Sequence, residues 1–319
     1  SVIGSEYGAR AAHELQLGNL SGFTNQLRLG RKAGGYPDWL LEYARNILNS
    51  CGPDAILFTG GDAEVFPIWY CQFIDSVRTD VSVAPVPLLD RPWFVLALKS
   101  GLDNSIRPVA LLWTREQITD MHVSKWTTRT FDLPIPLEVQ RSFGISDSSF
   151  QWVLAPDLQR DGRTLLSVNR IVMLGLLRAN NWRRPVHFSL GCHSWMLSGL
   201  DDHLQLHAMT NELVPFSVKA KGRKVNLEAT IPFLTNPSNF RQLVTLKDQD
   251  IPYLSAPLNN YRSAYFHTCD SLLRRGDFTV ALQILQSMDT NVSASVLPMP
   301  DGWKTEIEDL RTKITTTMR

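Results

Sequence analysis

The chain has 319 residues, 44% hydrophobic and 20% charged, which is typical of a globular protein and excludes a disordered or fibrous one. Lys and Arg number 32 against 31 Asp and Glu, so the net charge of +1 gives no indication of nucleic-acid or anionic-membrane binding. No run of about 18 apolar residues predicts a transmembrane helix. The four cysteines form no CxxC pair, which excludes a zinc ribbon, and we expect buried thiols.

Predicted strands and helices alternate up to about residue 220, which indicates an α/β fold with a Rossmann-like, mostly parallel sheet and flanking helices. Ala55–Thr59 is a short apolar run between turn residues, the pattern of a strand buried on both faces. Asp38 is the predicted N-cap of the preceding helix. The predicted helices are Trp39–Ser50, 63–77, Trp93–Leu98 and Leu165–Asn180, and the predicted strands are Ala55–Thr59, Val81–Val86, Val109–Thr114, Gln151–Ala155 and Pro185–Leu190.

The C-terminal part has a different pattern. Asn259–Arg275 and Phe278–Met288 are predicted helices joined by a Gly276 turn, and Trp303–Met318 is a third. The first two suit a tetratricopeptide-like hairpin that caps the α/β body. We therefore divide the chain into an N-terminal extension (1–36), an α/β domain (37–225) and a helical C-terminal region (226–319).

The turn Thr59-Gly60-Gly61-Asp62 is the first candidate binding surface, with Thr59, Gly60, Gly61 and Asp62 as candidate residues. It follows a predicted parallel strand and precedes a helix, where open α/β sheets bind ligands. Glycines allow close approach, and free N–H groups at a helix start can hold an anion. Alternatively, Asp62 caps the helix. Neither GxGxxG nor a Walker A loop is present, so nothing specifies a nucleotide, and we expect no cofactor.

A second group of candidates joins a predicted helix to a predicted strand. Trp182, Arg183, Arg184 and His187 lie there, and paired arginines can bind phosphate or carboxylate. The favoured alternative is that the arginines bond the carbonyls at the C-terminal end of the helix.

A metal site is the weaker interpretation of a histidine-rich stretch. His203 and His207 would share one face of a helix, with Asp201 and Asp202 nearby, but the same residues also alternate like a strand. We expect ordinary polar histidines and no metal. Two sequons, Asn19-Leu20-Ser21 and Asn291-Val292-Ser293, matter only if the chain passes through a eukaryotic secretory pathway.

An ordered set of segments runs from about residue 37 to about 290. The segments are Trp39–Cys51, Pro53–Asp62, Phe66–Gln72, Val77–Val81, Leu88-Leu89 with Trp93, Asn180–Phe188, Leu204–Leu206, Glu212–Pro215, Tyr261-Arg262, Arg275–Asp277 and Ala281-Leu282. Together they resemble the soluble C-terminal region of the multispanning protein O-mannosyltransferase-like membrane proteins, long catalogued as a domain of unknown function. Where that family has an Asn-Gly-Asp-Asn-like turn, this chain has Gly60-Gly61-Asp62 and lacks the asparagine.

The resemblance implies a glycosyltransferase parent whose mannosyl transfer takes place in a membrane-embedded N-terminal part, so no catalytic residue carries over. This chain, which begins at Ser1 without Met, would be a non-catalytic extramembrane module, periplasmic or lumenal and membrane-tethered. It would present acceptor polypeptide or glycan, with the membrane-embedded region as a further partner and no nucleic acid.

Two alternatives remain open. The first is a stand-alone soluble hydrolase or transferase that uses Asp62 with His187 or His193. The second is a structural partner in a membrane-associated assembly, with the helical C-terminal region as its interface.

Overall fold

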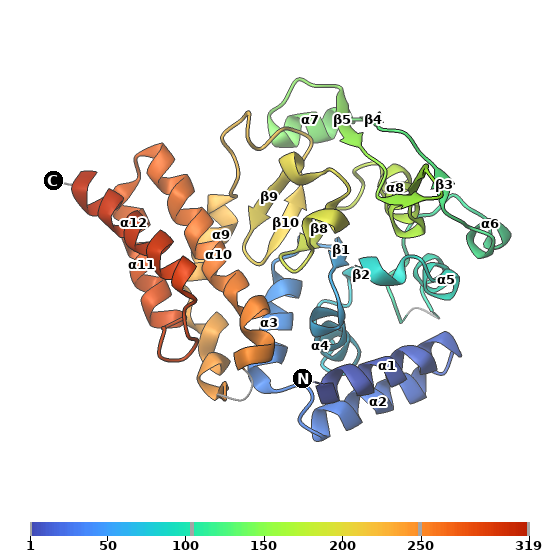
Figure 1. The fold of residues 1–319 in the computed structure, drawn as a ribbon, viewed down its shortest axis with the longest axis horizontal. Helices are drawn as coiled ribbons and strands as arrows, with labels where there is room; N and C mark the ends of the chain where they lie inside the picture. Colours follow the sequence, from blue (N-terminus) through green and yellow to red (C-terminus); the bar gives the residue numbers. More distant parts are fainter. Residues whose placement is uncertain (1, 103–104, 248–250, 318–319) are drawn as a thin grey trace.

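A central sheet lies between two groups of helices in the computed structural model, which describes residues 2–102, 105–247 and 251–317 (Figure 1). The helices are α1 (Val2–Gln16), α2 (Leu20–Lys32), α3 (Asp38–Asn49), α4 (Asp62–Phe73), α5 (Pro92–Ser100), α6 (Arg115–Thr119), α7 (Leu137–Phe143), α8 (Val168–Asn180), α9 (Leu227–Thr235), α10 (Ile251–Arg275), α11 (Phe278–Asn291) and α12 (Asp301–Thr317). Short 3-10 helices are η1 (Val86–Leu88), η2 (Ser194–Leu197), η3 (Asp201–His203) and η4 (Pro237–Thr245). Within these described ranges, no helix has the length and apolar character needed to cross a membrane.

The main sheet has the strand order β2-β1-β8-β10-β9. Its pairings are parallel from β2 to β8 and antiparallel from β8 to β9. The expectation of a mostly parallel sheet was therefore wrong, and the fold is a mixed α/β one. The reason is the two-residue connection Ala208-Met209 between β9 and β10, which is too short for the crossover that parallel strands need. The strands are β1 (Ile56–Thr59), β2 (Ser82–Pro85), β8 (Val186–Ser189), β9 (Leu204–His207) and β10 (Thr210–Leu213).

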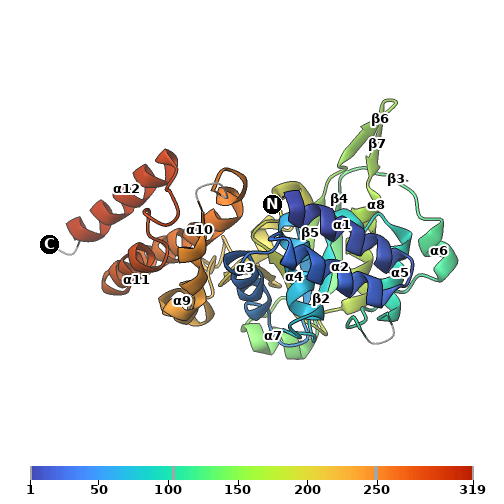
Figure 2. The ribbon, with the colours of Figure 1, turned by 90° about the horizontal axis from the view of Figure 1, so that it is seen from below.

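Residues outside the main sheet form two smaller ones. β4 (Arg129–Pro134) pairs with β5 (Ser149–Leu154), and β3 (Ser124–Lys125), β7 (Arg163–Leu166) and β6 (Leu158–Arg160) form a three-stranded sheet. The β6–β7 hairpin projects from the body (Figure 2).

Several boundaries differ from those expected. The stretch predicted as strand Val109–Thr114 is irregular, although its buried Val109 and Leu111 alternate with exposed Ala110 and Leu112. Thr114 instead caps α6 through a capping box with Gln117. The predicted strand Gln151–Ala155 belongs to the separate β4–β5 pair, and the helix expected from Leu165 begins at Val168, since β7 occupies the residues before it. Asp38 is the first residue of α3, whose N-cap is Pro37.

Residues 2–36 fold into a pair of antiparallel helices, α1 and α2, which packs on α4. The Phe23 ring lies edge-on to Trp69 and Phe73, with centroids 5.7 and 4.7 Å away. A Cβ built on Gly8 would lie 2.0 Å from the Phe66 ring, so glycine lets α1 approach α4 closely. The buried side chains of α1 and α2, such as Ala11 and Leu27, belong to the same hydrophobic core as those of α4.

The C-terminal helices are attached to α3 by polar bonds. Asn46 Nδ2 donates to the Tyr261 hydroxyl at 2.8 Å and to the Asn239 carbonyl at 2.6 Å. The Glu42 carboxylate accepts from the Gln242 amide at 3.0 and 3.1 Å. Helix α3 therefore holds the sheet on one side and the helical region on the other.

Arg262, fully buried in α10, holds the connection between α11 and α12. Its guanidinium donates to the backbone carbonyls of Val292 (3.4 Å), Leu297 and Pro298 (3.2 Å). Burial lowers the pKa of Arg262 to about 10, so the side chain stays charged at neutral pH.

Replacing Arg262 by Met should lower the free energy of unfolding by about 2–3 kcal/mol, because buried carbonyls lose their donor. Denaturant titration measures the loss, and hydrogen exchange should locate it in α11 and α12. Arg274→Met is the matched control, because Arg274 lies in the same helix and its exposed side chain pairs with Asp270. Equal stabilities of the two variants would contradict the anchoring role of Arg262.

Candidate functional site

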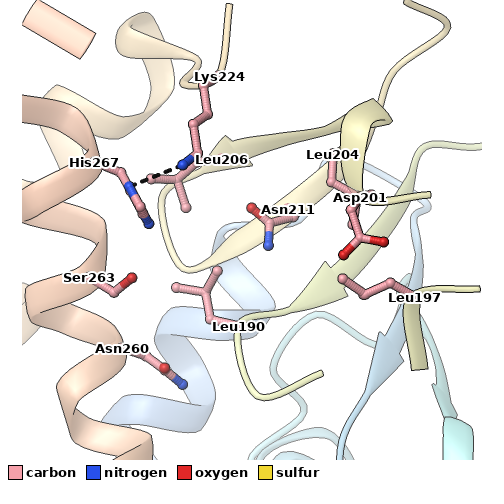
Figure 3. Close-up of a pocket in the computed structure, with 10 residues that line it drawn as sticks. All are labelled: Leu190, Leu197, Asp201, Leu204, Leu206, Asn211, Lys224, Asn260, Ser263 and His267. Atoms are coloured by element: carbon pink, nitrogen blue, oxygen red, sulfur yellow. Dashed lines mark hydrogen bonds between the residues drawn. The ribbon is translucent and has the colours of Figure 1, made fainter. Parts of the chain in front are cut away.

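A cavity of about 240 Å³ lies between α10 and the strands β9 and β10 (Figure 3). A neighbouring hollow of about 490 Å³ shares Asp201, Lys224 and His267 with it. Together they have the size of an ordinary small-ligand site. Apolar side chains of Leu190, Leu197, Leu204 and Leu206 and polar side chains of Asp201, Asn211, Lys224, Asn260, Ser263 and His267 line the smaller cavity.

The polar lining comes from two elements. Asn260, Ser263 and His267 are spaced three and four residues apart and so share one face of α10. Asn211 comes from the centre of β10, where it pairs with Phe188 and Leu206, and its amide points between the leucines (Figure 3). The Asn211 amide and the Ser263 hydroxyl make no side-chain hydrogen bond to the other residues that the structure describes.

His267 is neutral in this cavity. Burial lowers its pKa to about 4, and the nearby Lys224 charge adds to the effect. Lys224 Nζ lies 3.4 Å from His267 Nδ1. A lysine ammonium only donates, so Nδ1 accepts and the ring proton sits on Nε2. The cavity therefore offers an imidazole N–H, amides, a hydroxyl, the Asp201 carboxylate and the Lys224 ammonium, which suits a ligand rich in hydroxyl or amide groups.

Glu64 is a buried carboxylate that the sequence reasoning missed. Its Oε2 accepts from the Ser189 hydroxyl at 2.5 Å and from the Gly60 amide at 3.2 Å. Its Oε1 accepts from the Tyr43 hydroxyl at 3.1 Å, which in turn accepts from Asn260 Nδ2 at 2.9 Å. The network runs from the β1–α4 turn to the wall of the cavity. The available signal was its position directly before the apolar run Val65–Tyr70.

Burial raises the pKa of Glu64, and the donated hydrogen bonds from Ser189, Gly60 and Tyr43 partly oppose that shift. The site gives a carboxylate its donors without a neighbouring cation.

The Thr59-Gly60-Gly61-Asp62 turn is built around this carboxylate. A Cβ on Gly60 would lie 2.7 Å from the Gly191 carbonyl oxygen, and one on Gly191 would lie 2.4 Å from Glu64 Oε1. Gly60 therefore lets the loops after β1 and β8 touch. Gly61 is the exposed N-cap of α4, and Asp62, also exposed, is the first helical residue and does not cap the helix. Thr59 is buried, and its hydroxyl has no partner among the described residues.

The second candidate group lies at the other end of β1. Arg184 donates to the carbonyls of Asp54 (2.6 Å) and Ala55 (3.0 Å), which precede β1, and to that of Pro108 (2.8 Å). Arg183 donates to Ala179 and Asn180 at the C-terminal end of α8, as the alternative interpretation predicted. The structure thus separates this group from the Thr59–Asp62 turn.

Trp182 packs edge-on against Phe150, with ring centroids 5.3 Å apart. It is half-buried, and its indole nitrogen has no hydrogen-bond partner among the described residues.

The histidines occupy separate positions. His187, buried in β8, accepts from the Gly52 amide at Nε2 (3.2 Å), so its Nδ1 carries the proton and donates to the Thr210 hydroxyl (2.9 Å). His203 Nδ1 bonds Phe216, and His207 Nδ1 bonds Ser50. His203 ends η3 and His207 ends β9, so the helical metal-binding geometry is not formed. Among the described residues, no three His, Cys, Asp or Glu side chains could share a metal ion.

The enzyme alternative requires Asp62 to act with His187 or His193. Both ring nitrogens of His187 are engaged inside the fold, while His193 is exposed at the N-cap of η2. None of the three residues lines either cavity beside α10.

The family model of TMEM260-associated domain 2 matches residues 40–148 and 128–231. The chain belongs to this family. The match covers the α/β body from α3 into α9, so this TMEM260-associated domain supplies the sheet side of the cavity, while α10 lies beyond the matched residues. No curated protein and no solved structure matches the chain significantly.

The Gly60→Ala and Gly61→Ala variants compare a glycine whose Cβ position is blocked by neighbouring atoms with one whose Cβ position is open. Gly60→Ala should cost about 1–3 kcal/mol of stability, because the new methyl group meets the Gly191 backbone. Gly61→Ala should cost less than about 1 kcal/mol, because nothing lies within 4 Å of its Cβ position and only the N-cap preference for glycine over alanine is lost. Thermal unfolding measures both, and a costlier Gly61→Ala would contradict the role given to Gly60.

Acid should destabilise the protein through His187. Burial, with smaller contributions from His207 and Arg78, lowers the pKa of His187 to about 3, against about 6.5 when unfolded. The folded state thus disfavours protonation, and its stability is full above pH ~6.5 and falls as the pH drops toward the folded pKa. Between pH ~6.5 and ~5 the wild type should lose about 1.5 kcal/mol more than His187→Gln.

Denaturant titration at several pH values tests this difference. The exposed His193→Gln is the control and should follow the wild type. Parallel stability curves for wild type and His187→Gln would show that His187 is not buried as a neutral ring.

Proposed function

We propose that this chain is the non-catalytic extramembrane module of an O-mannosyltransferase-like membrane protein and that it holds acceptor polypeptide or glycan. Membership of the TMEM260-associated domain 2 family supports an association with a membrane protein. The ordered resemblance from Trp39 to Leu282 supports the glycosyltransferase parent. The module lies on the periplasmic or lumenal side, tethered to the membrane-embedded part.

The α10 cavity is the proposed binding site. The observation that carries this proposal is the pair Asn211 and Ser263, which line the same cavity and whose side chains make no hydrogen bond to the other described residues. Half-buried polar groups without partners leave hydrogen-bonding capacity that a ligand can use. Peptides and sugars both combine hydroxyl or amide groups with apolar surface, which suits this lining.

A finer description of the architecture belongs to the same proposal. The parallel β2-β1-β8 part, with α4 connecting β1 to β2, is a Rossmann-like half-sheet. The α10–α11 pair, joined at Gly276, is a tetratricopeptide-like hairpin that serves as the second wall of the cavity. In this arrangement the sheet supplies a fixed surface and the hairpin closes it.

Ligand titration of the whole chain tests the site. Synthetic acceptor peptides and mannose-bearing glycans are the probes, and two-dimensional NMR or calorimetry reports binding. Ser263→Phe, which fills the cavity, should weaken binding by more than tenfold, and Asn211→Ala by about tenfold through the loss of one hydrogen bond. Asp62→Ala, at the exposed turn, is the control and should bind like the wild type.

The outcomes separate the two candidate surfaces, provided that circular dichroism shows each variant folded. Loss of binding in Asp62→Ala alone would move the site to the β1–α4 turn. Binding of no probe by the wild type would contradict the presenting role.

A further inference from the structure

The two glycosylation sequons lie in opposite environments. Asn19 is exposed in the turn between α1 and α2, and Asn291 is partly buried at the end of α11. The sequence motif alone does not distinguish them, because each is Asn-X-Ser with an aliphatic residue in the middle. Their side-chain bonds do.

Asn19 can carry a substituent without losing its structural role. It is the N-cap of α2, and its Oδ1 accepts from the Gly22 amide and from the Ser21 hydroxyl, both at 3.0 Å. Nδ2 makes one bond, to Glu14 at 2.7 Å. Glycosylation replaces one of the two N–H groups and leaves Oδ1 untouched, so the cap persists and one N–H group remains.

Asn19 contacts Gly22 and Glu14 on one side, and the turn residues that precede it leave open space on the other. No atom lies within 4 Å of a Cβ built on the adjacent Gly18, and Leu17 is 66% exposed. The α1–α2 turn lies at the end of the molecule away from α10, α11 and α12 (Figures 1 and 2). A glycan there projects into solvent and leaves the α10 cavity uncovered.

Asn291 has no such freedom. Its Nδ2 donates to the Leu234 carbonyl, the Tyr265 hydroxyl and the Ser287 hydroxyl, all at 3.1 Å. Tyr265 is fully buried and itself donates to Leu234 at 2.6 Å. A sugar on Nδ2 would separate α11 from α10 and α9, so a chain modified at Asn291 does not reach this fold.

We propose that Asn19 is an N-linked glycosylation site and that Asn291 stays unmodified in the folded protein. The co-substrate is a lipid-linked oligosaccharyl diphosphate. Nδ2 of Asn19 attacks C1 of its first sugar, the new N–C bond replaces the C–O bond to the diphosphate, Nδ2 loses one proton, and the lipid diphosphate leaves. The natural modification rests on the proposed extracytoplasmic location in a eukaryotic cell.

Secretion of the chain from cultured animal cells behind a cleavable signal peptide tests the site. The folded protein in the medium should lose the mass of one glycan on treatment with peptide-N-glycosidase, and peptide mapping should place the resulting Asp at position 19. Ser21→Ala removes the sequon and keeps the Asn19 cap, so it should abolish the shift. Ser21→Thr preserves the sequon and should retain the shift.

Matched controls make the result specific. Ser293→Ala removes the other sequon and should leave the shift unchanged, and cytosolic expression should give no shift. A secreted, folded protein without a glycan, or a shift abolished by Ser293→Ala, would overturn the proposal. Either result would leave the proposed function standing, because the signal peptide places the chain in the lumen whatever its natural location.

Discussion

The buried Glu64 carboxylate joins three parts of the structure. Its oxygens receive the Ser189 hydroxyl after β8, the Gly60 amide after β1, and the Tyr43 hydroxyl of α3. A buried carboxylate is costly unless donors surround it, so the loops and α3 are held where those donors reach. Tyr43 then orients Asn260 in the cavity wall, so the geometry of the site depends on a group that is itself inaccessible to ligand.

The opposite end of β1 is held by a cation, the Arg184 guanidinium. Arg184 donates to the carbonyls of Asp54 and Ala55 before β1 and to that of Pro108. Its Nη2 also lies 3.5 Å from Asp54 Oδ1. The two ends of β1 thus have complementary chemistry, with a carboxyl group that accepts hydrogen bonds at one end and a guanidinium that donates them at the other. Guanidinium geometry, with several fixed donors, suits backbone carbonyls better than a lysine would.

Local pattern predicted the elements whose signal is continuous in sequence. The apolar run Ala55–Thr59 and the periodic stretch after Asn259 became β1 and α10. The antiparallel pairing of β9 and β10 could not be inferred that way. Their turn, Ala208-Met209, contains neither Gly nor Asn, the residues that usually indicate a two-residue hairpin. The helices α1 and α2 were missed because their glycines, such as Gly8 and Gly30, weaken helical patterning while permitting close packing.

The candidate site was the hardest part to anticipate. The turn Thr59–Asp62 was identified as the end of a strand, but its Gly60 amide donates to the buried Glu64 carboxylate. Sequence periodicity places Glu64 in a helix without indicating that it is buried. The cavity combines β10 and α10, which are some 50 positions apart in sequence, and no local spacing encodes that proximity. Asn and Ser are common residue types, and Asn211 and Ser263 stand out from the others in the chain only because the fold brings both to the same cavity.

The attachment of α10 to α3 has a practical consequence for truncated forms. A fragment that stops where the family match ends, at residue 231, would keep the sheet and lose Asn260, Tyr261 and the other half of the cavity. The Tyr43 hydroxyl would lose its donor Asn260, the Asn46 amide would lose both of its acceptors, and the leucines of the sheet face would become solvent-exposed. Such a fragment would be prone to self-association, and its failure to bind a ligand would carry no information about the intact chain.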